Sequence, residues 1–207
     1  MLGQISLNLA FIFYCVLYVP QIVHNHKQRD LGGLSILMHI ILYCAYLFDL
    51  LYGSLTGLPW QYRLIAALGW IYLTLQQLQL IHYYRYEQRY TLVSLFFFIW
   101  IGSGILLGYT LVHTTYHDAL VTCFGFIAQI GFCIALLPQI IKSHQKQSIA
   151  AISLTYVVFN SFLSCLDIIC AWQFNWGWPN KLGSIGLLCL TVILMLQKKH
   201  YNREKNR

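Results

Sequence analysis

Two aspartates, Asp49 and Asp167, each interrupt a long apolar stretch of the sequence. They are two of only six acidic residues, and the other four lie in polar connections or near the C-terminus. A carboxyl group that is removed from water favours its neutral form, so it can load a proton on one side of a membrane and release it on the other. It can also hold the amine of a substrate. The sequence therefore indicates proton coupling at these two positions.

Polar side chains recur at helical spacing beside each aspartate. Residues three or four apart share one face of a helix, so each set forms a stripe that can line a pocket or hydrogen-bond neighbouring helices. The stripe that leads to Asp167 contains Tyr156, Asn160 and Ser164, and the stripe that leads to Asp49 contains His39, Tyr43 and Tyr46. Imidazole titrates near neutral pH, so His39 can relay a proton or, when neutral, bond a neighbour. Further pocket candidates are Asn8, Gln76 and Gln129.

No set of residues predicts an enzyme. The sequence lacks a nucleophile elbow, a glycine loop that would cradle phosphate, and an HExxH metal motif. His113, His117 and Asp118 lie close together, but three groups in one connection are a weak metal signal. The seven cysteines contain no CxxC pair and are expected to pack as small apolar side chains without disulfides. We therefore expect no cofactor and no metal.

The elements that must position these residues are predicted to be membrane-spanning helices. The chain is 58% hydrophobic and 9% charged, whereas soluble domains carry about 25% charged residues. The first apolar stretch has no basic region before it, which favours a retained span over a signal peptide. Each stretch is close to the roughly 20 residues that cross a bilayer. We predict an all-α integral membrane protein with seven transmembrane helices, at about residues 3–23, 34–54, 61–82, 91–112, 119–141, 152–172 and 180–198.

The basic residues predict the orientation in the membrane. All but Arg63 and Lys181 of the 13 Lys and Arg residues fall on alternate connections and on the C-terminal tail, which is the positive-inside pattern. It places the N-terminus outside or in a lumen and the C-terminus in the cytoplasm. The short connections favour a bacterial inner membrane over a lysosome-like one. Topology and contact with anionic lipid then explain the net charge of +7, and no nucleic-acid partner is expected.

The orientation leaves other roles open for Asp49 and Asp167. Each lies about five residues from the outer end of its predicted span, roughly 7–8 Å at helical rise. The two carboxyl groups can therefore be solvated at an outer mouth, or hydrogen-bond two helices together, in place of carrying protons.

The chain contains an internal repeat, in which residues 1–89 match residues 119–207 at a shift of 118 positions. Each copy holds three predicted helices, so one intervening helix is needed to give both copies the same orientation. We therefore predict a 3+1+3 plan: a first triple-helix bundle at 1–89, a linker helix at 90–118 that carries Gly104 and Gly108, and a second bundle at 119–207. Both bundles are present in one chain, so it is expected to work as a monomer. The repeat aligns Pro20 with Pro138, Gln21 with Gln139 and Asp49 with Asp167.

Two repeat-related prolines, Pro20 and Pro138, lie inside the first predicted helix of each bundle. Proline removes a backbone hydrogen bond and pushes against the preceding turn, and in lipid the freed carbonyl must find another partner. The neighbouring Gln21 and Gln139 amides are natural candidates for that partner. Each proline can therefore act as a hinge or hold a static kink.

Both copies of this segment resemble the PQ-loop motif. LPQIIK at 137–142, followed by Ile152-Ser153-Leu154, looks like the full motif, and YVPQIV at 18–23, followed by Gly33-Leu34-Ser35, resembles it. The chain is thus similar to the PQ-loop superfamily, which includes cystinosin-like amino-acid exporters, SWEET and SemiSWEET sugar carriers, and KDEL receptors. The resemblance covers the whole chain and implies alternating access, with two bundles rocking about a central substrate site and the motif prolines as hinges.

The resemblance leaves the substrate open. In cystinosin-like exporters an acid in the second helix of the second triplet is linked to proton coupling; the aligned position here holds Asn160, and Asp167 follows two turns later. The sugar branch pairs an Asn and a Trp in each bundle, whereas Asn160 aligns with Leu42. We predict an alternating-access transporter of a small polar solute, with a proton-coupled amino-acid transporter as the first hypothesis. A proton-independent sugar uniporter is the first alternative, and a non-transporting receptor or accessory protein is the second.

Overall fold

The computed structural model describes the chain outside residues 29–35, 85–103, 105–107, 109–117, 146–151 and 206–207. The described residues form helices joined by short turns and contain no strand. Six helical segments, with α1 and α2 counted as one, are long and apolar enough to cross a membrane. The helices are α1 (Leu2–Val16), α2 (Val19–Gln28), α3 (Ile36–Leu55), α4 (Trp60–Tyr84), α6 (Asp118–Gln145), α7 (Leu154–Gln173) and α8 (Trp178–Lys205).

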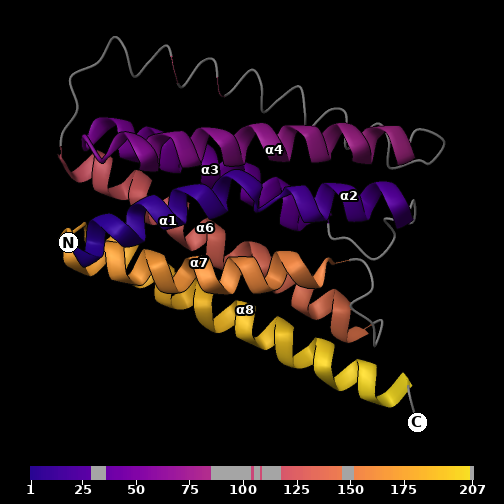
Figure 1. The fold of residues 1–207 in the computed structure, drawn as a ribbon. Helices are drawn as coiled ribbons and strands as arrows, with labels where there is room; N and C mark the ends of the chain where they lie inside the picture. Colours follow the sequence, from indigo (N-terminus) through magenta and orange to yellow (C-terminus); the bar gives the residue numbers. More distant parts are fainter. Residues whose placement is uncertain (29–35, 85–103, 105–107, 109–117, 146–151, 206–207) are drawn as a thin grey trace.

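Six of the seven predicted spans coincide with these helices, although α2, α6 and α8 extend beyond the predicted ends. The remaining predicted span, at 91–112, lies outside the described residues apart from Gly104 and Gly108, so it stays a prediction. The flanking helices run in the same direction, and α4 ends at the opposite end of the bundle from the start of α6 (Figure 1). That direction is the one the 3+1+3 plan requires.

Local sequence explains where several helices begin. Ser153 caps α7, because its extended backbone (φ −65°, ψ 124°) lets the hydroxyl accept a hydrogen bond from Tyr156 N at 3.4 Å. Pro59 directly precedes α4 and Pro179 is the second residue of α8, where a missing N–H has no cost. Asp118 in the first turn of α6 complements the positive end of the helix dipole.

The six spans close into a ring. Within each repeat unit the third helix packs between the other two, since α4 contacts α1 and α3, and α8 contacts α6 and α7. Between the units the contacts are reciprocal, because α1 packs on α7 and α3 packs on α6. Each contact joins the first helix of one unit to the second helix of the other. This pairing is typical of two parallel repeats related by an axis along the membrane normal.

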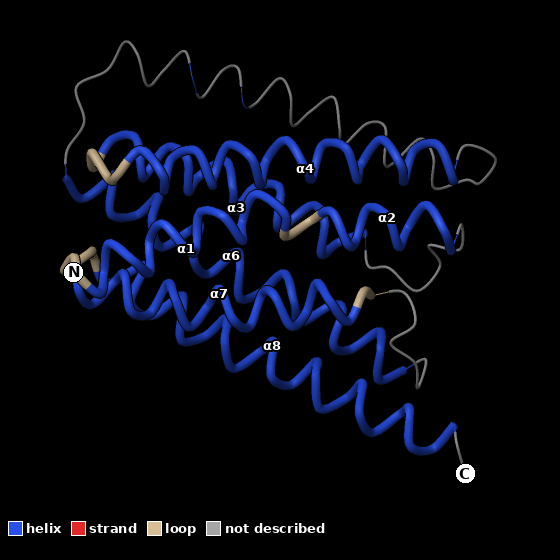
Figure 2. The backbone as a smooth tube through the Cα atoms, in the orientation of Figure 1, coloured by secondary structure: helices blue, strands red, loops and turns tan. Residues whose placement is uncertain are grey.

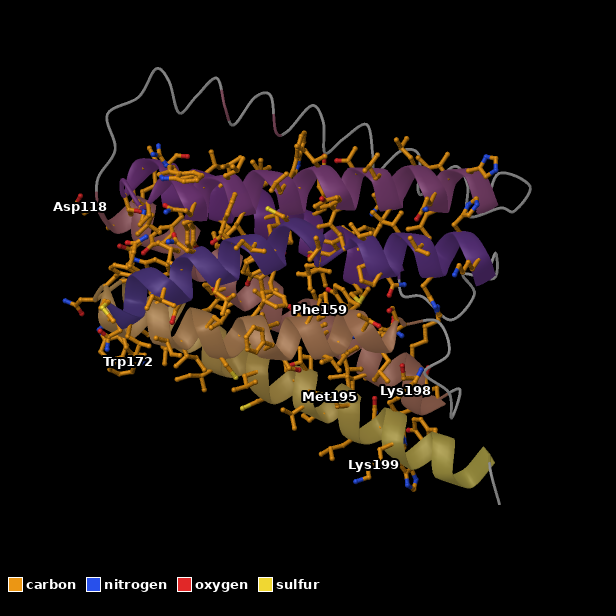
Figure 3. The ribbon with its side chains drawn as sticks, viewed as in Figure 1. Asp118, Phe159, Trp172, Met195, Lys198 and Lys199 are labelled. Atoms are coloured by element: carbon orange, nitrogen blue, oxygen red, sulfur yellow. The ribbon has the colours of Figure 1, made fainter. Side chains whose placement is uncertain are left out.

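Small residues allow the two units to approach closely. A Cβ added at Gly131 of α6 would lie 3.0 Å from the Ala45 Cβ of α3, and Ala128 and Ala135 of α6 are fully buried. Small side chains at helix contacts are the usual means of packing in lipid, where burial of apolar surface gives little driving force. Along the bundle, Trp172 and Asp118 lie toward one end, and Lys198 and Lys199 lie toward the other (Figure 3).

The two motif segments differ in backbone structure. In the first unit, the helix that carries the motif is interrupted at Leu17-Tyr18, between α1 and α2. In the second unit, the corresponding helix α6 continues through Pro138 to Gln145 (Figure 2). Tyr72 of α4 donates its hydroxyl to the Cys15 carbonyl at 2.6 Å, in the last turn before the interruption. The repeat counterpart of Tyr72 is Leu190, which has no hydroxyl. The interrupted helix therefore receives a hydroxyl donor that the corresponding position of the second unit cannot supply.

A second glutamine in each unit supports both motif segments in the same way. Gln79 Nε2 donates to the Ile22 carbonyl, and its repeat counterpart Gln197 donates to the Ile140 carbonyl, each at 3.3 Å. Each bond ties the third helix of a unit to the carbonyl two residues after the motif proline. These contacts hold both segments in place, and only the first segment is also interrupted.

We predict that Tyr72→Phe destabilises the protein. Loss of the hydroxyl leaves the Cys15 carbonyl without this donor in a water-poor interior, and the cost should be about 1 kcal/mol. Thermal unfolding of the purified protein in detergent measures the effect as a fall in Tm. Thr74→Val is the matched control, because the Thr74 hydroxyl donates to the Trp70 carbonyl one turn back in its own helix and bonds no carbonyl at the interruption. Equal Tm values for the two variants would refute the role of Tyr72.

A second prediction concerns the span at 91–112. If this segment crosses the membrane, the number of spans is odd, so the two termini lie on opposite faces, with the C-terminus in the cytoplasm. Fusions of a reporter that fluoresces only in the cytoplasm, and of one active only outside it, at residues 84, 118 and 207 test this. Positions 84 and 207 should report cytoplasm and position 118 the opposite face. The same face for 84 and 118 would exclude the seventh span.

Candidate functional site

A cavity lies inside the ring of helices, and each of the six described spans contributes to its lining. Its volume is about 80 Å³, and since one water needs about 10–15 Å³ measured in this way, it can hold several waters or a small solute. The apolar lining consists of Leu7, Ala10, Leu42, Ile65, Phe132, Leu136 and Leu187. The polar and aromatic lining consists of Tyr14, Tyr18, Tyr46, Asp49, Tyr62, Gln129, Tyr156, Asn160, Asp167, Trp176, Asn180 and Ser184.

Asp167 is held by a hydrogen bond that crosses between the repeat units. Tyr14 of α1 donates its hydroxyl to Asp167 Oδ2 of α7 at 2.5 Å. A short bond of this kind is typical of a carboxylate acceptor. Asp167 is half-buried and receives this one side-chain hydrogen bond among the described residues. Part of its carboxyl group is therefore available to whatever enters the cavity.

Asp49 is more enclosed than its repeat counterpart, with 6% of its surface exposed. Tyr62 of α4 donates its hydroxyl to Asp49 Oδ1, and Gln129 Nε2 of α6 donates to the same oxygen at 3.3 Å. The first bond lies within the repeat unit, and the second crosses to the other unit. Asp49 is therefore fixed from two sides by neutral donors.

The two aspartates are conserved within the repeat, but their partners are not. Tyr14, which bonds Asp167, has Phe132 as its counterpart, and Gln129, which bonds Asp49, has Phe11. Each unit thus supplies one donor from its first helix to the acid of the other unit, at different positions. The two units therefore share the same helix arrangement and the same acid, but the hydrogen-bond donors to the two acids differ.

The cavity lining contains no positively charged side chain among the described residues. Arg63 is exposed beside the lining residue Tyr62. Lys181 Nζ donates to Asn175 Oδ1 at 2.8 Å, outside the lining, where the Trp172 and Trp178 rings flank it at 5.1 and 5.4 Å. An ionised carboxyl group without a cation in a water-poor interior costs several kcal/mol. Asp49 and Asp167 can therefore be stabilised by a proton, by a cationic ligand or by their hydroxyl and amide donors.

Asn180 offers hydrogen bonds that no described residue takes up. Its side chain lines the cavity with 4% of its surface exposed, and neither Oδ1 nor Nδ2 has a hydrogen-bond partner among the described residues. Buried amides are nearly always bonded. Its backbone is engaged, because its N–H donates to Gly177 O and its carbonyl accepts from Ser184 Oγ. The free amide is therefore placed to bind an occupant of the cavity.

At the end near the motifs, tyrosines close the cavity between the two units. Tyr18 donates its hydroxyl to Tyr46 at 2.8 Å, and the rings of Tyr18 and Tyr156 lie 5.6 Å apart. Beside them, Gln21 Oε1 accepts a hydrogen bond from Ser153 N at 2.9 Å. Because Tyr156 and Ser153 belong to the second unit, these contacts join the first motif to the start of α7.

At the opposite end, an apolar cluster joins the units. Leu7 of α1 packs with Cys170 and Ala171 of α7 and with Trp176 of the turn before α8. The ring of Tyr62, from α4, meets that of Trp176 edge to face at 5.3 Å. The cavity therefore lies between two layers of side chains, each of which spans both repeat units.

Six of the predicted pocket and coupling residues do line the cavity, and five do not. Ser164 is fully buried, and its hydroxyl bonds the Asn160 carbonyl of its own helix. His39 Nε2 pairs with Gln76 Oε1 at 2.7 Å between α3 and α4, and Asn8 lies at the surface, where it accepts from Gln4 and Gln61. The residues that line the cavity are Asp49, Asp167, Asn160, Tyr156, Tyr46 and Gln129. Those outside the lining are Ser164, His39, Gln76, Asn8 and Tyr43, whose ring packs on Trp70.

The predicted hinge residues lie beside the cavity. Pro20 follows the interruption between α1 and α2, and Pro138 lies inside α6. Gln21 is bonded to Ser153 N, and Gln139 Nε2 donates to Ser143 Oγ at 3.2 Å. The hinge role of these residues stays a prediction.

Sequence reasoning missed half of the polar lining, namely Tyr14, Tyr18, Tyr62, Trp176, Asn180 and Ser184. One signal was present, because four of these have apolar repeat counterparts. A polar residue in one copy and an apolar one in the other marks a position that the scaffold does not require to be polar.

No group of three or more His, Cys, Asp or Glu side chains able to hold a metal occurs in the described part of the chain. Of the weak cluster noted in the sequence, His113 and His117 lie outside the described residues.

Comparison with known proteins agrees with the fold. A family model described as the PQ loop repeat matches residues 2–62 and 120–180, which together cover more than half of the chain and are offset by 118 positions, the same shift that relates the two repeat units. A solved structure, described as that of a eukaryotic SWEET transporter at 3.7 Å resolution, superimposes with a TM-score of 0.67. It is 12% identical and covers 96% of this chain and 100% of its own. No curated protein sequence matches significantly.

The duplicated match shows that each repeat unit is one PQ-loop unit, and the superposition places both in a SWEET-like fold. Among the described residues, this fold arranges six helices that are long and apolar enough to cross a membrane around a central cavity. The chain belongs to the PQ-loop repeat family.

Proposed function

We propose that the protein is an alternating-access carrier that couples a small polar solute bearing an amine, an amino acid foremost, to protons. One observation carries this proposal: two carboxyl groups share a central cavity whose described lining supplies neutral hydrogen-bond donors but no cation. Such groups are stable when protonated or when paired with a cationic ligand. Both states are what a proton-coupled carrier of amines uses.

The two acids take different parts in this function. Asp167 is half-buried, has one donor and borders the cavity, so it exchanges its proton readily. Asp49 is enclosed and held by two donors, so it sets the negative potential of the site and holds α3, α4 and α6 together. We therefore assign proton coupling chiefly to Asp167, with Asp49 in support.

The two cross-unit layers serve as gates in this proposal. The layer around Tyr18 and Tyr156 closes the cytoplasmic side, and the layer around Trp176 and Tyr62 closes the outer side. Alternating access requires that one layer separates while the other holds. Rocking of the two bundles about the motif prolines, within a 3+1+3 monomer, would produce this exchange.

The neutral polar groups of the cavity would bind the rest of the solute. Asn160 and Gln129 were predicted for this part from the sequence, and Asn180 adds an amide with both atoms free among the described residues. Amides that can donate and accept suit a solute with carbonyl or hydroxyl groups.

A proton-independent sugar uniporter is the second candidate. The free amide of Asn180 beside aromatic rings favours it, since hydroxyl groups and sugar faces bind such surfaces. In that case the aspartates only bond helices together, as their links to Tyr14, Tyr62 and Gln129 would allow.

We predict that a pH difference across the membrane drives solute flux through Asp167. Purified protein in liposomes is tested with labelled amino acids and sugars, with and without an imposed pH difference. An amine-bearing solute should move, and Asp167→Asn should reduce the pH-driven component by at least about tenfold, equivalent to about 1.4 kcal/mol. Asp49→Asn should keep a pH response at a lower rate.

Asp118→Asn is the matched control, because Asp118 is an exposed acid at the start of α6, outside the cavity. It should behave as wild type. Equilibration of a sugar that ignores both the pH difference and Asp167→Asn would reject proton coupling and support the uniporter. Absence of flux for every solute would reject the carrier function.

A further inference from the structure

The charge balance of the cavity limits which solutes it can accept. The titratable side chains that line it come from α1, α3, α4 and α7 and from the interruption after α1, while α6 and α8 contribute none to the described lining. Every one of these groups is neutral or negative in its ordinary states. They are Tyr14, Tyr18, Tyr46, Asp49, Tyr62 and Tyr156, all of which share the cavity with Asp167.

A carboxylate on the solute would have no cationic partner in this site. It would meet the fields of Asp49 and Asp167, with neutral donors such as Asn180 Nδ2 as its available contacts. An ammonium group meets the opposite situation, since carboxylates and aromatic faces both attract cations. The rings of Tyr14, Tyr62 and Trp176 line the same cavity as the two acids. A solute with net positive charge is therefore favoured over a zwitterion or an anion.

The two acids do not offer equal places for that charge. Both donors to Asp49 contact its Oδ1, and the residue is almost fully enclosed. Asp167 has a single donor, on Oδ2, and is half-buried. The free amide of Asn180 gives the second, independent sign that this cavity is built for an occupant. Asp167 is thus the acid that a cation can reach.

Resting on the carrier function proposed above, we infer that the solute is an organic cation with net positive charge, and that its ammonium group and a proton compete for the Asp167 carboxyl group. Binding of the cation releases the proton from Asp167 to water, and departure of the cation lets a proton return. One carboxyl group cannot hold both at once. The carrier therefore exchanges cation for proton across the membrane, and does not move both in the same direction.

The test compares three probes of similar length: L-lysine, 1,5-diaminopentane and L-norleucine. Lysine carries net positive charge, diaminopentane has no carboxylate, and norleucine matches the lysine backbone without the side-chain amine. Calorimetry of the purified protein in buffers with different ionisation enthalpies gives both affinity and the number of protons released. We expect both cations to bind at least about tenfold more tightly than norleucine, with about one proton released for each bound cation at a pH where free Asp167 is protonated. Affinity should weaken up to about tenfold for each unit of falling pH where Asp167 takes up its proton.

Variants assign the effect to Asp167. Asp167→Asn should lose proton release and cation binding, Asp167→Glu should restore both in part, and Asp49→Asn should keep proton release. Thermal unfolding checks that each variant is folded, and the Asp167→Glu result keeps the test decisive if the Asn variant is unstable. Cation binding without proton release, or unchanged release in Asp167→Asn, would overturn the inference.

The failure of this inference can be told from failure of the carrier function. If norleucine binds as tightly as lysine and a pH difference drives its flux in liposomes, the exchange of cations is wrong and the proton-coupled carrier stands. If no probe binds and no solute moves, both are wrong.

Discussion

The constraint on which the site depends is that a carboxyl group in a water-poor cavity needs a proton, a cation or strong donors. Here two such groups face one cavity, and the described lining gives them only hydroxyl and amide donors. The donors come from helices of both repeat units, so the acids also hold the units together. A change in the charge of Asp167 alters its bond to Tyr14, and that bond joins α1 to α7 across the interface that moves in the proposed mechanism. The chemistry of the site and the mechanics of the bundle are therefore linked at one contact.

The internal repeat explains the scaffold, and divergence between the copies explains the site. Helix order, the reciprocal α1–α7 and α3–α6 contacts and the Gln79 and Gln197 bonds all follow the repeat. The lining does not follow it, because Tyr14 and Gln129 have phenylalanine counterparts. The backbone departs too, since the first helix is interrupted beside Pro20 and α6 is not interrupted at Pro138. A duplicated scaffold has thus kept its two acids while each unit acquired its own partners for them.

The sequence predicted the membrane class, all six described spans, the repeat and the position of both acids inside spans, because isolated charges in apolar runs and a fixed repeat are strong signals. It predicted less of the lining, since tyrosine is common in this chain and its spacing alone does not tell Tyr14 from a lipid-facing residue. The sequence did not indicate Asn180 as a cavity residue, because it follows Pro179 at a helix start, where polar residues are common for local reasons. The stripe from His39 to Asp49 is wide enough to face two neighbours, so Tyr46 and Asp49 reach the cavity while His39 pairs with Gln76 on α4. Which face of a helix meets a cavity is set by packing, which one sequence does not contain.

The central claim is that protonation of Asp167 is linked to solute movement, and the pH inside sealed proteoliposomes tests it most directly. A pH-sensitive dye is enclosed at equal pH on both sides, and lysine is then added outside to wild type and to Asp167→Asn. The account predicts that the interior of wild-type vesicles becomes more alkaline as lysine enters and protons leave, and that the variant shows no such change. Lysine entry with no change in internal pH, or the same change in Asp167→Asn, would contradict it.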